Sequence, residues 1–216
     1  MLQACSPAVE PGSTPSAAIA ALQGAMNLLI VALFTLLAIA SFHHYVGSGS
    51  LQAFAVLAVN ALFLALFLTR RPAKAETCSV PLWLLGLSGT ALPLLLRPAT
   101  PWHGPRVGST LELIGIAMLI IALLSLRRSF AVVPGNRGIQ RDGMYRLVRH
   151  PVYLSELTLL LGVVLANPSV LNAMIWACEC VLQLARARAE ERFLAADPLY
   201  PAYCKQVRFR LIPWLV

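Results

Sequence analysis

The chain has 216 residues, of which 58% are hydrophobic and 12% are charged, and its mean hydropathy is +0.74. Soluble domains carry about 25% charged residues, so this composition excludes an ordinary soluble domain. The net charge of +8 could suggest a nucleic-acid partner, but the basic residues are distributed as in a membrane protein. We therefore expect an integral membrane protein with no nucleic-acid partner.

Six apolar runs follow one another along the chain. They are Gly24–Phe42, Leu51–Thr69, Val80–Leu96, Val107–Leu126, Val152–Ala166 and Ser169–Ala185. Each of the first four approaches the roughly 20 residues that a helix needs to cross the hydrocarbon core. The last two are shorter and are joined by Asn167-Pro168-Ser169, in which Ser169 is a natural N-cap. The pattern predicts an all-α, polytopic transmembrane bundle of about six spans that ends in a helical hairpin.

Basic residues lie almost entirely on one side of these runs. All but two of the 17 Lys and Arg residues follow the second, fourth or sixth run, and only Arg97 and Arg106 fall on the other side. The positive-inside rule then predicts that both termini are cytoplasmic. We expect a multi-pass protein of a bacterial-type inner membrane.

The chain is expected to form one membrane domain, residues 24–216, because no repeat or linker divides it. Residues 1–23 lack the basic n-region of a signal peptide and are expected to remain as a weakly ordered cytoplasmic leader. Residues 24–106 form a variable part, and function is expected in residues 107–216, where the runs contain Glu112, Glu156 and Glu179. The five cysteines include no C-x-x-C pair, so neither a disulfide framework nor a metal site is expected.

Polar residues recur on one face of the sixth predicted helix. At about 100° per residue, the spacings of 7, 4, 3, 4 and 7 bring six side chains to within roughly 40° of one another. These residues are Asn172, Glu179, Gln183, Arg186, Glu190 and Asp197. We expect the helix to continue as far as Asp197-Pro198, where the proline ends it. An ion pair between Arg186 and Glu190 could explain part of the stripe, but it leaves Glu179 and Gln183 without a reason.

The start of the fifth predicted helix provides a second group of polar and aromatic residues. His150 and Pro151 begin this helix, and Tyr153 follows three residues after His150. Arg149 and Tyr145 lie just before it. Because the fifth and sixth runs form a hairpin, both polar groups are expected to meet at the cytoplasmic end of the bundle.

These residues, taken together, resemble a known family. The resemblance rests on Arg149-His150-Pro151-Val152-Tyr153, Asn167-Pro168, Arg186 four residues before Glu190-Glu191, Leu194, and Tyr200-Pro201-Ala202-Tyr203. This ordered set is similar to the C-terminal half of isoprenylcysteine carboxyl methyltransferases, whose superfamily includes phospholipid N-methyltransferases and bacterial thiol methyltransferases. The resemblance covers about Gly135 to Pro213. The first three runs carry no such motif, so the substrate pocket stays unspecified.

The resemblance implies a methyltransferase that uses S-adenosylmethionine, bound at the cytoplasmic mouth of the last two spans. It implies that Tyr145, His150, Pro151 and Tyr153 hold the cofactor, that Glu190 and, with less weight, Glu191 receive its ammonium, and that Arg149 and Arg186 lie near the acceptor. A carboxylate, a thiol or a lipid amine delivered from the bilayer could be that acceptor. An amine would also need a base, for which His150 and Glu156 are candidates. The oligomeric state stays open.

Three other functions remain possible at this point. Membrane sterol-type reductases have a similar C-terminal pattern and use NADPH, but the Arg-His-Pro motif and the Glu190-Glu191 pair favour the methyltransferase. An ion or proton transporter could use Glu112, Glu156 and Glu179, although no inverted repeats are visible. The chain could also be a non-catalytic membrane scaffold.

Overall fold

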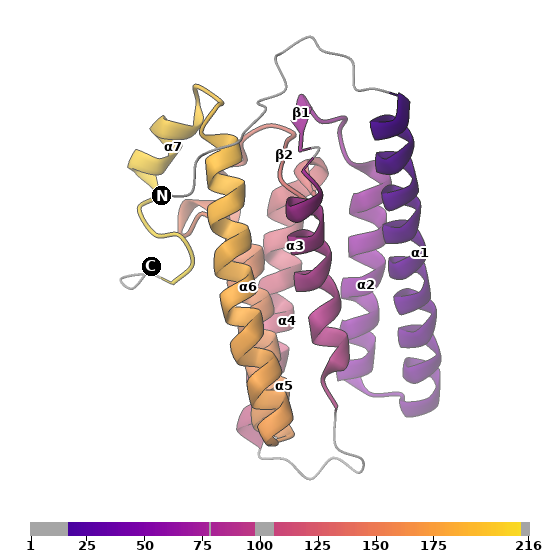
Figure 1. Ribbon diagram of the computed structural model, residues 1–216. Helices are drawn as coiled ribbons and strands as arrows, with labels where there is room; N and C mark the ends of the chain where they lie inside the picture. Colours follow the sequence, from indigo (N-terminus) through magenta and orange to yellow (C-terminus); the bar gives the residue numbers. More distant parts are fainter. Residues whose placement is uncertain (1–16, 78, 98–105, 213–216) are drawn as a thin grey trace.

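The computed structural model describes residues 17–77, 79–97 and 106–212, and these residues form a bundle of helices (Figure 1). The α-helices are α1 Ala17–Ser48, α2 Leu51–Thr69, α3 Val80–Ala91, α4 Arg106–Leu126, α5 Pro151–Ala166, α6 Val170–Leu194 and α7 Tyr200–Gln206. Three 3₁₀ turns occur at η1 Leu92–Leu95, η2 Arg127–Ser129 and η3 Gly143–Arg146. Most of the expected leader lies outside the described residues, and α1 begins at Ala17.

Among the described residues, four helices are long and apolar enough to cross a membrane, namely Gln23–Ser48, Leu51–Thr69, Arg106–Ser129 and Val170–Leu194. Large apolar side chains on these helices are exposed, among them Leu28, Val46, Val107 and Val181. Such surfaces are stable against lipid rather than water. The expected integral membrane protein with a helical bundle is therefore confirmed.

The lengths of two helices differ from the sequence-based expectation. The third run was expected to approach the length of a span, but Val80–Leu95 is a shorter helix whose last turn, around Pro93, is 3₁₀. The sixth run was expected to be short, but α6 has 25 residues. The reason is that the helix continues through its polar residues well beyond Ala185, where the apolar run ends.

The end of α6 also differs from the prediction. The helix ends at Leu194, three residues before Asp197, which had been expected to continue the polar stripe. The Asp197 carboxylate instead accepts hydrogen bonds from the backbone N–H of Leu199 at 2.9 Å and from the Asn136 amide at 2.7 Å. A short acidic side chain that binds a backbone N–H two residues later favours a turn over a helix.

The described residues also contain a small strand pair that the pattern did not predict. Strands β1, Ala75–Glu76, and β2, Gly135–Asn136, pair antiparallel and join the α2–α3 connection to the α4–α5 connection. The Arg137 guanidinium reinforces this junction through an ion pair with Glu76 at 3.0 Å. Two-residue strands are too short to produce a periodic signal in the sequence.

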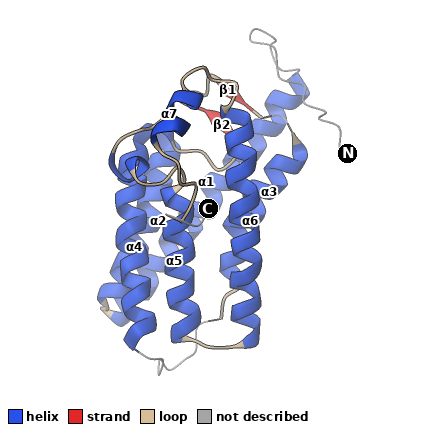
Figure 2. Cartoon of the chain, turned by 90° about the vertical axis from the view of Figure 1, so that its left-hand side faces the viewer, coloured by secondary structure: helices blue, strands red, loops and turns tan. Residues whose placement is uncertain are grey.

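Helices α4 and α5 pack along each other and form the largest interface between two described helices (Figure 2). Gly115 of α4 lies against the backbone of Leu159, and Gly162 of α5 lies against the backbone of Glu112. A Cβ at either position would collide with that backbone, so glycine permits this close approach. Helix α1 packs on α2, α2 packs on α4, and α3 packs on α6. In the α5–α6 hairpin, α5 therefore packs against α4 and α6 packs against α3.

Candidate active site

His150 is the residue directly before α5, so the first turn of this helix fixes its position. Pro151 occupies the first position of the helix, where its missing N–H has no partner to lose. His150 precedes this proline with non-helical backbone angles, φ −126° and ψ 64°, as proline requires of its neighbour. The His150 side chain is buried, and it faces α6.

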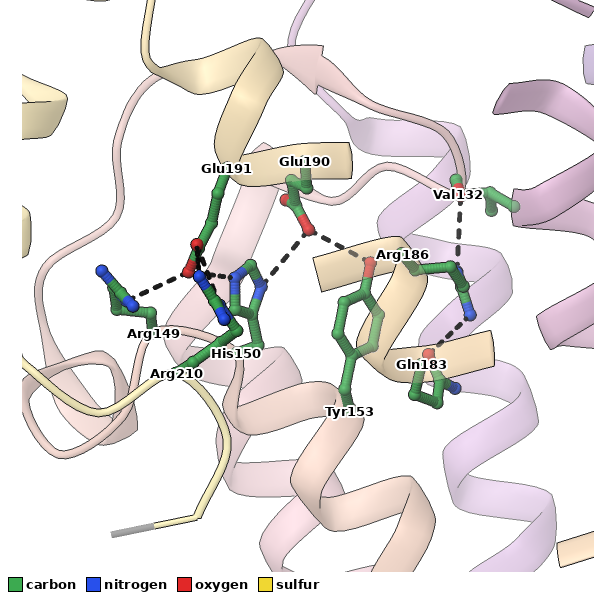
Figure 3. Close-up of polar contacts among 9 residues, drawn as sticks. All are labelled: Val132, Arg149, His150, Tyr153, Gln183, Arg186, Glu190, Glu191 and Arg210. Carbon is green, nitrogen blue, oxygen red and sulfur yellow. Dashed lines mark hydrogen bonds and ion pairs between the residues drawn. The ribbon is translucent and has the colours of Figure 1, made fainter. Parts of the chain in front are cut away.

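Two carboxylates from α6 contact the His150 ring (Figure 3). Nδ1 lies 3.4 Å from Oε2 of Glu190, and Nε2 lies 3.2 Å from Oε1 of Glu191. The ring also stacks on Tyr153, with centroids 5.4 Å apart and planes 7° apart. The Tyr153 hydroxyl donates to Oε2 of Glu190 at 3.1 Å. His150, Tyr153 and Glu190 therefore form one connected unit.

The surroundings of His150 favour its protonated form. Burial alone lowers the pKa of His150, but the hydrogen bonds and negative charges of Glu190 and Glu191 outweigh burial and raise this pKa above its ordinary value. An imidazolium can donate through both nitrogens, which matches a carboxylate on each side. A role of His150 as the base for an amine acceptor stays a prediction.

Glu191 connects three segments of the chain, which are α6, the start of α5 and the C-terminal segment. Its Oε1 lies 3.1 Å from Nε of Arg149, in addition to the contact with His150. Its Oε2 accepts from Nε and Nη2 of Arg210, at 2.9 and 2.6 Å. The backbone N–H groups of Arg149 and His150 donate to the carbonyls of Phe209 and Arg210, at 2.9 and 3.0 Å. Glu191 thus fastens the C-terminal segment beside the start of α5.

Arg186 is buried one turn of α6 before Glu190. Its Nη1 donates to Oε1 of Gln183 at 3.1 Å, its Nη2 lies 3.4 Å from the carbonyl oxygen of Val132, and its Cζ lies 4.8 Å from the centre of the Tyr153 ring. No carboxylate in the described part of the chain forms an ion pair with it. The alternative of an Arg186–Glu190 ion pair is therefore not what the structure contains.

A buried amide links Arg186 to two glutamates. Nε2 of Gln183 donates to Oε2 of Glu156 and to Oε1 of Glu179, at 2.7 Å each. Gln183 and Glu179 are completely buried, and Oε2 of Glu179 has no hydrogen-bond partner among the described residues. The predicted stripe on α6 is confirmed for Asn172, Glu179, Gln183 and Arg186, which are all buried. It faces the interior of the bundle.

These groups surround a cavity of about 450 Å³. One end is polar and aromatic, and it is lined by Tyr145, Arg149, His150, Tyr153, Glu156, Arg186, Glu190, Tyr200 and Tyr203, together with Gly135 and residues 137–140. The other end is apolar and is lined by α1, α2, α4 and α5, including Phe34, Leu37, Val56, Val59, Phe63, Ile116, Leu119 and Leu160. The volume is within the roughly 300–1,000 Å³ typical of small-molecule sites. The cavity can therefore hold a polar group and an apolar group side by side.

Comparison with known proteins relates this arrangement to one family. Residues 109–196 match the isoprenylcysteine carboxyl methyltransferase (ICMT) family. The match covers less than half of the chain, and it confirms the superfamily predicted from the motifs. It indicates a membrane methyltransferase in general terms. No curated protein matches the chain.

All eight candidate site residues lie inside the ICMT-matched segment, and six of them line the cavity. These six are Tyr145, Arg149, His150, Tyr153, Arg186 and Glu190. Glu191 does not line it, and it contacts the back of the His150 ring. Tyr145 is held by the hydroxyl of Tyr203, which donates to its carbonyl at 2.9 Å, and burial raises the pKa of the Tyr145 hydroxyl well above its ordinary value.

The eighth candidate, Pro151, is buried at the start of α5 and is not among the residues that line the cavity. It acts on the site through the backbone, because it sets the angles of His150 and starts the helix that carries Tyr153. Its contact with a cofactor stays a prediction.

The sequence did not point to two contributors outside the ICMT-matched segment. Arg210 binds Glu191, and Gly89 of α3 lies against the side chain of Arg186. Gly86 and Gly89 are three positions apart in an apolar run. The known signal for close helix packing in membranes is a pair of small residues four positions apart, so this glycine pair did not identify α3 as a neighbour of α6. Arg210 has no local signal either.

Proposed function

We propose that this protein is a membrane methyltransferase that transfers a methyl group from S-adenosylmethionine to an anionic group, a carboxylate or thiolate, of a lipophilic acceptor. The observation that carries the proposal is Arg186, a buried guanidinium at the cavity that forms no direct ion pair with a carboxylate among the described residues. A buried charge is stabilised when it is paired directly with an opposite charge. An anionic acceptor would form that direct pair.

The polar end of the cavity fits the chemical groups of S-adenosylmethionine. Glu190 offers a carboxylate to an ammonium group, and the rings of His150, Tyr153 and Tyr145 offer flat surfaces and hydrogen bonds to a nucleoside. When bound, the cofactor would supply a sulfonium methyl group, whose transfer to a carboxylate oxygen breaks a C–S bond, leaves the electron pair on sulfur and needs no base. The work of the protein is then to hold and align both partners.

Arg186 is assigned to the acceptor because a guanidinium can hold a carboxylate through two parallel hydrogen bonds. Arg149 lines the same cavity but already pairs with Glu191, so we give it a secondary role at the acceptor. Glu191 is assigned to positioning, since it contacts His150, Arg149 and Arg210 rather than the cavity. Glu190 is left as the acidic residue for the cofactor's ammonium.

The proposed acceptor is lipophilic because the cavity continues into an apolar end between α1, α2, α4 and α5. With the polar end on the cytoplasmic side, as the distribution of arginines favours, a water-soluble cofactor would enter from the cytosol and the acceptor from the bilayer. This arrangement gives a reason for the enzyme to reside in a membrane.

The test is methyl transfer by the purified protein in detergent, with methyl-labelled S-adenosylmethionine and N-acetyl-S-farnesylcysteine as the probe. Its methyl ester, which lacks the anion, is the matched control, and farnesylamine represents an amine acceptor. We expect label in the free carboxylate and none in the ester. Labelling of farnesylamine alone would contradict the anionic acceptor, and binding of NADPH without binding of S-adenosylmethionine would favour the reductase.

A further inference from the structure

We propose that Gly89 of α3 and Gln183 of α6 are positioning residues that together hold the Arg186 guanidinium in place. This inference rests on the proposed role of Arg186 toward an anionic acceptor. It brings α3, which lies outside the segment matched to the ICMT family, into the handling of that acceptor.

Gly89 leaves the space that the Arg186 side chain occupies. A Cβ built at position 89 would lie 2.8 Å from Cδ and 2.9 Å from Nη1 of Arg186. Real side chains do not approach so closely, so even one methyl group must displace something. The atoms in the way belong to the flexible end of an arginine rather than to backbone, and moving them costs the fold little. Glycine at this position therefore decides where the guanidinium lies.

Gln183 fixes the same group through the orientation of its amide. Arginine only donates hydrogen bonds, whereas carboxylates accept them. Oε1 of Gln183 must therefore face Arg186, at 3.1 Å, while Nε2 faces Glu156 and Glu179, at 2.7 Å each. Arg186, Glu156 and Glu179 all require the same orientation of the Gln183 amide. Because Gln183 is completely buried, the amide cannot flip without losing all three hydrogen bonds.

The remaining contacts complete the enclosure of the guanidinium. The Tyr153 ring lies 4.8 Å from Cζ, and the Val132 carbonyl lies 3.4 Å from Nη2. Gly89 also lines the cavity itself, as do Arg186 and Tyr153. In a reaction whose protein contribution is mostly alignment, a displacement of ~1 Å can reduce the rate ~100-fold. A methyl group at position 89 should therefore slow the reaction of the acceptor and leave the binding of the cofactor unchanged.

The experiment compares Gly89→Ala with Gly47→Ala, a control whose added Cβ would meet nothing within 4 Å. We expect Gly89→Ala to keep the wild-type thermal midpoint and S-adenosylmethionine affinity, and to lose roughly 10- to 100-fold in kcat/KM for N-acetyl-S-farnesylcysteine. Gly47→Ala should behave like wild type. When Arg186 is already replaced by alanine, Gly89→Ala should cause no further loss of affinity for the farnesylcysteine probe, because Gly89 acts through Arg186.

A second readout does not depend on any catalytic activity. Methylglyoxal modifies arginine side chains, and peptide mass spectrometry measures the rate at each site. Gly89→Ala and Gln183→Met should both make Arg186 several-fold more reactive, with Arg149 unchanged as the internal reference. The inference would be overturned if Arg186 in the Gly89→Ala variant reacted at the wild-type rate. It would also be overturned if Gly89→Ala reduced the affinity for the farnesylcysteine probe equally in the wild-type and the Arg186→Ala backgrounds. Failure of the wild type to bind S-adenosylmethionine would instead overturn the proposed function, and the reactivity of Arg186 would still decide the role of Gly89.

Discussion

The carboxylates of Glu190 and Glu191 contact opposite nitrogens of the same imidazole, that of His150. Neighbouring positions on a helix differ by about 100° in direction, so the two acids approach the ring from different sides. Glu190 reaches it at the cavity, and Glu191 reaches it where Arg149 and Arg210 also bind. Glu190 can therefore contact a ligand in the cavity, while Glu191 holds the C-terminal segment beside the start of α5.

The first prediction concerns pH. Because the folded pKa of His150 is raised, its protonated form stabilises the fold fully below its unfolded pKa of about 6.5, and this contribution disappears as pH rises through the folded value. The gap in thermal midpoint between wild type and His150→Gln should therefore be widest near pH 6 and should narrow toward pH 9. Scanning calorimetry in detergent measures the thermal midpoint of each protein as a function of pH. A gap that widens with pH would mean that the ring is neutral in the folded protein.

The second prediction concerns Arg186→Lys. The variant should keep most of the S-adenosylmethionine affinity and lose about 100-fold in turnover of N-acetyl-S-farnesylcysteine, because an ammonium cannot hold a carboxylate in a fixed orientation. Calorimetry and a labelled-methyl assay measure the two quantities separately. Wild-type turnover would mean that Arg186 has only a packing role, and a joint loss of both would move Arg186 to the cofactor.

The third prediction concerns the C-terminal segment. Arg210→Gln removes the charged donors to Glu191 and should weaken the pairing of this segment with Arg149 and His150 by about 1 kcal/mol. Hydrogen exchange at the amides of Arg149 and His150 should become roughly five-fold faster. Arg208→Gln changes an exposed arginine two residues away and serves as the control. Equal protection in the Arg210 and Arg208 variants would show that the side chain of Arg210 does not hold the segment.

The fourth prediction concerns topology. A membrane-impermeant thiol reagent applied outside sealed cells should miss Cys204, which follows α6 on the side of most arginines. Cys78 is expected on the same side but lies outside the described residues. A variant that keeps only Cys204 should react after the membranes are broken open. Rapid labelling in intact cells would reverse the orientation and move the cavity mouth away from cytosolic cofactor.

Much of the α5–α6 hairpin could be predicted because its signals are local. Ser169 caps α6 as expected, with its hydroxyl accepting from the Asn172 N–H at 3.0 Å, and Pro151 begins α5. The helical period placed Glu179, Gln183 and Arg186 on one buried face. These features depend on spacings within one segment, which a single sequence displays.

What could not be predicted depends on contacts between distant segments. The sequence does not show that Arg210 would reach Glu191, because no periodicity relates a helix to a loop that follows it. The pairing of β1 with β2 joins residues about 60 positions apart through only two residues on each strand. The sequence favoured Glu190 over Glu191 for the cofactor, but it did not show that Glu191 would bind Arg149, His150 and Arg210. Tertiary packing decides each of these cases.

Calorimetric titration of the purified protein with S-adenosylmethionine, for wild type and Glu190→Gln, tests whether Glu190 binds the cofactor. We expect one saturable site in wild type and a loss of ~2–5 kcal/mol of binding free energy in Glu190→Gln, because the variant removes the anion that faces the cofactor's ammonium. Glu191→Gln should cost much less affinity. Absence of binding in wild type would contradict S-adenosylmethionine as the cofactor, and equal affinity in wild type and Glu190→Gln would contradict the role of Glu190.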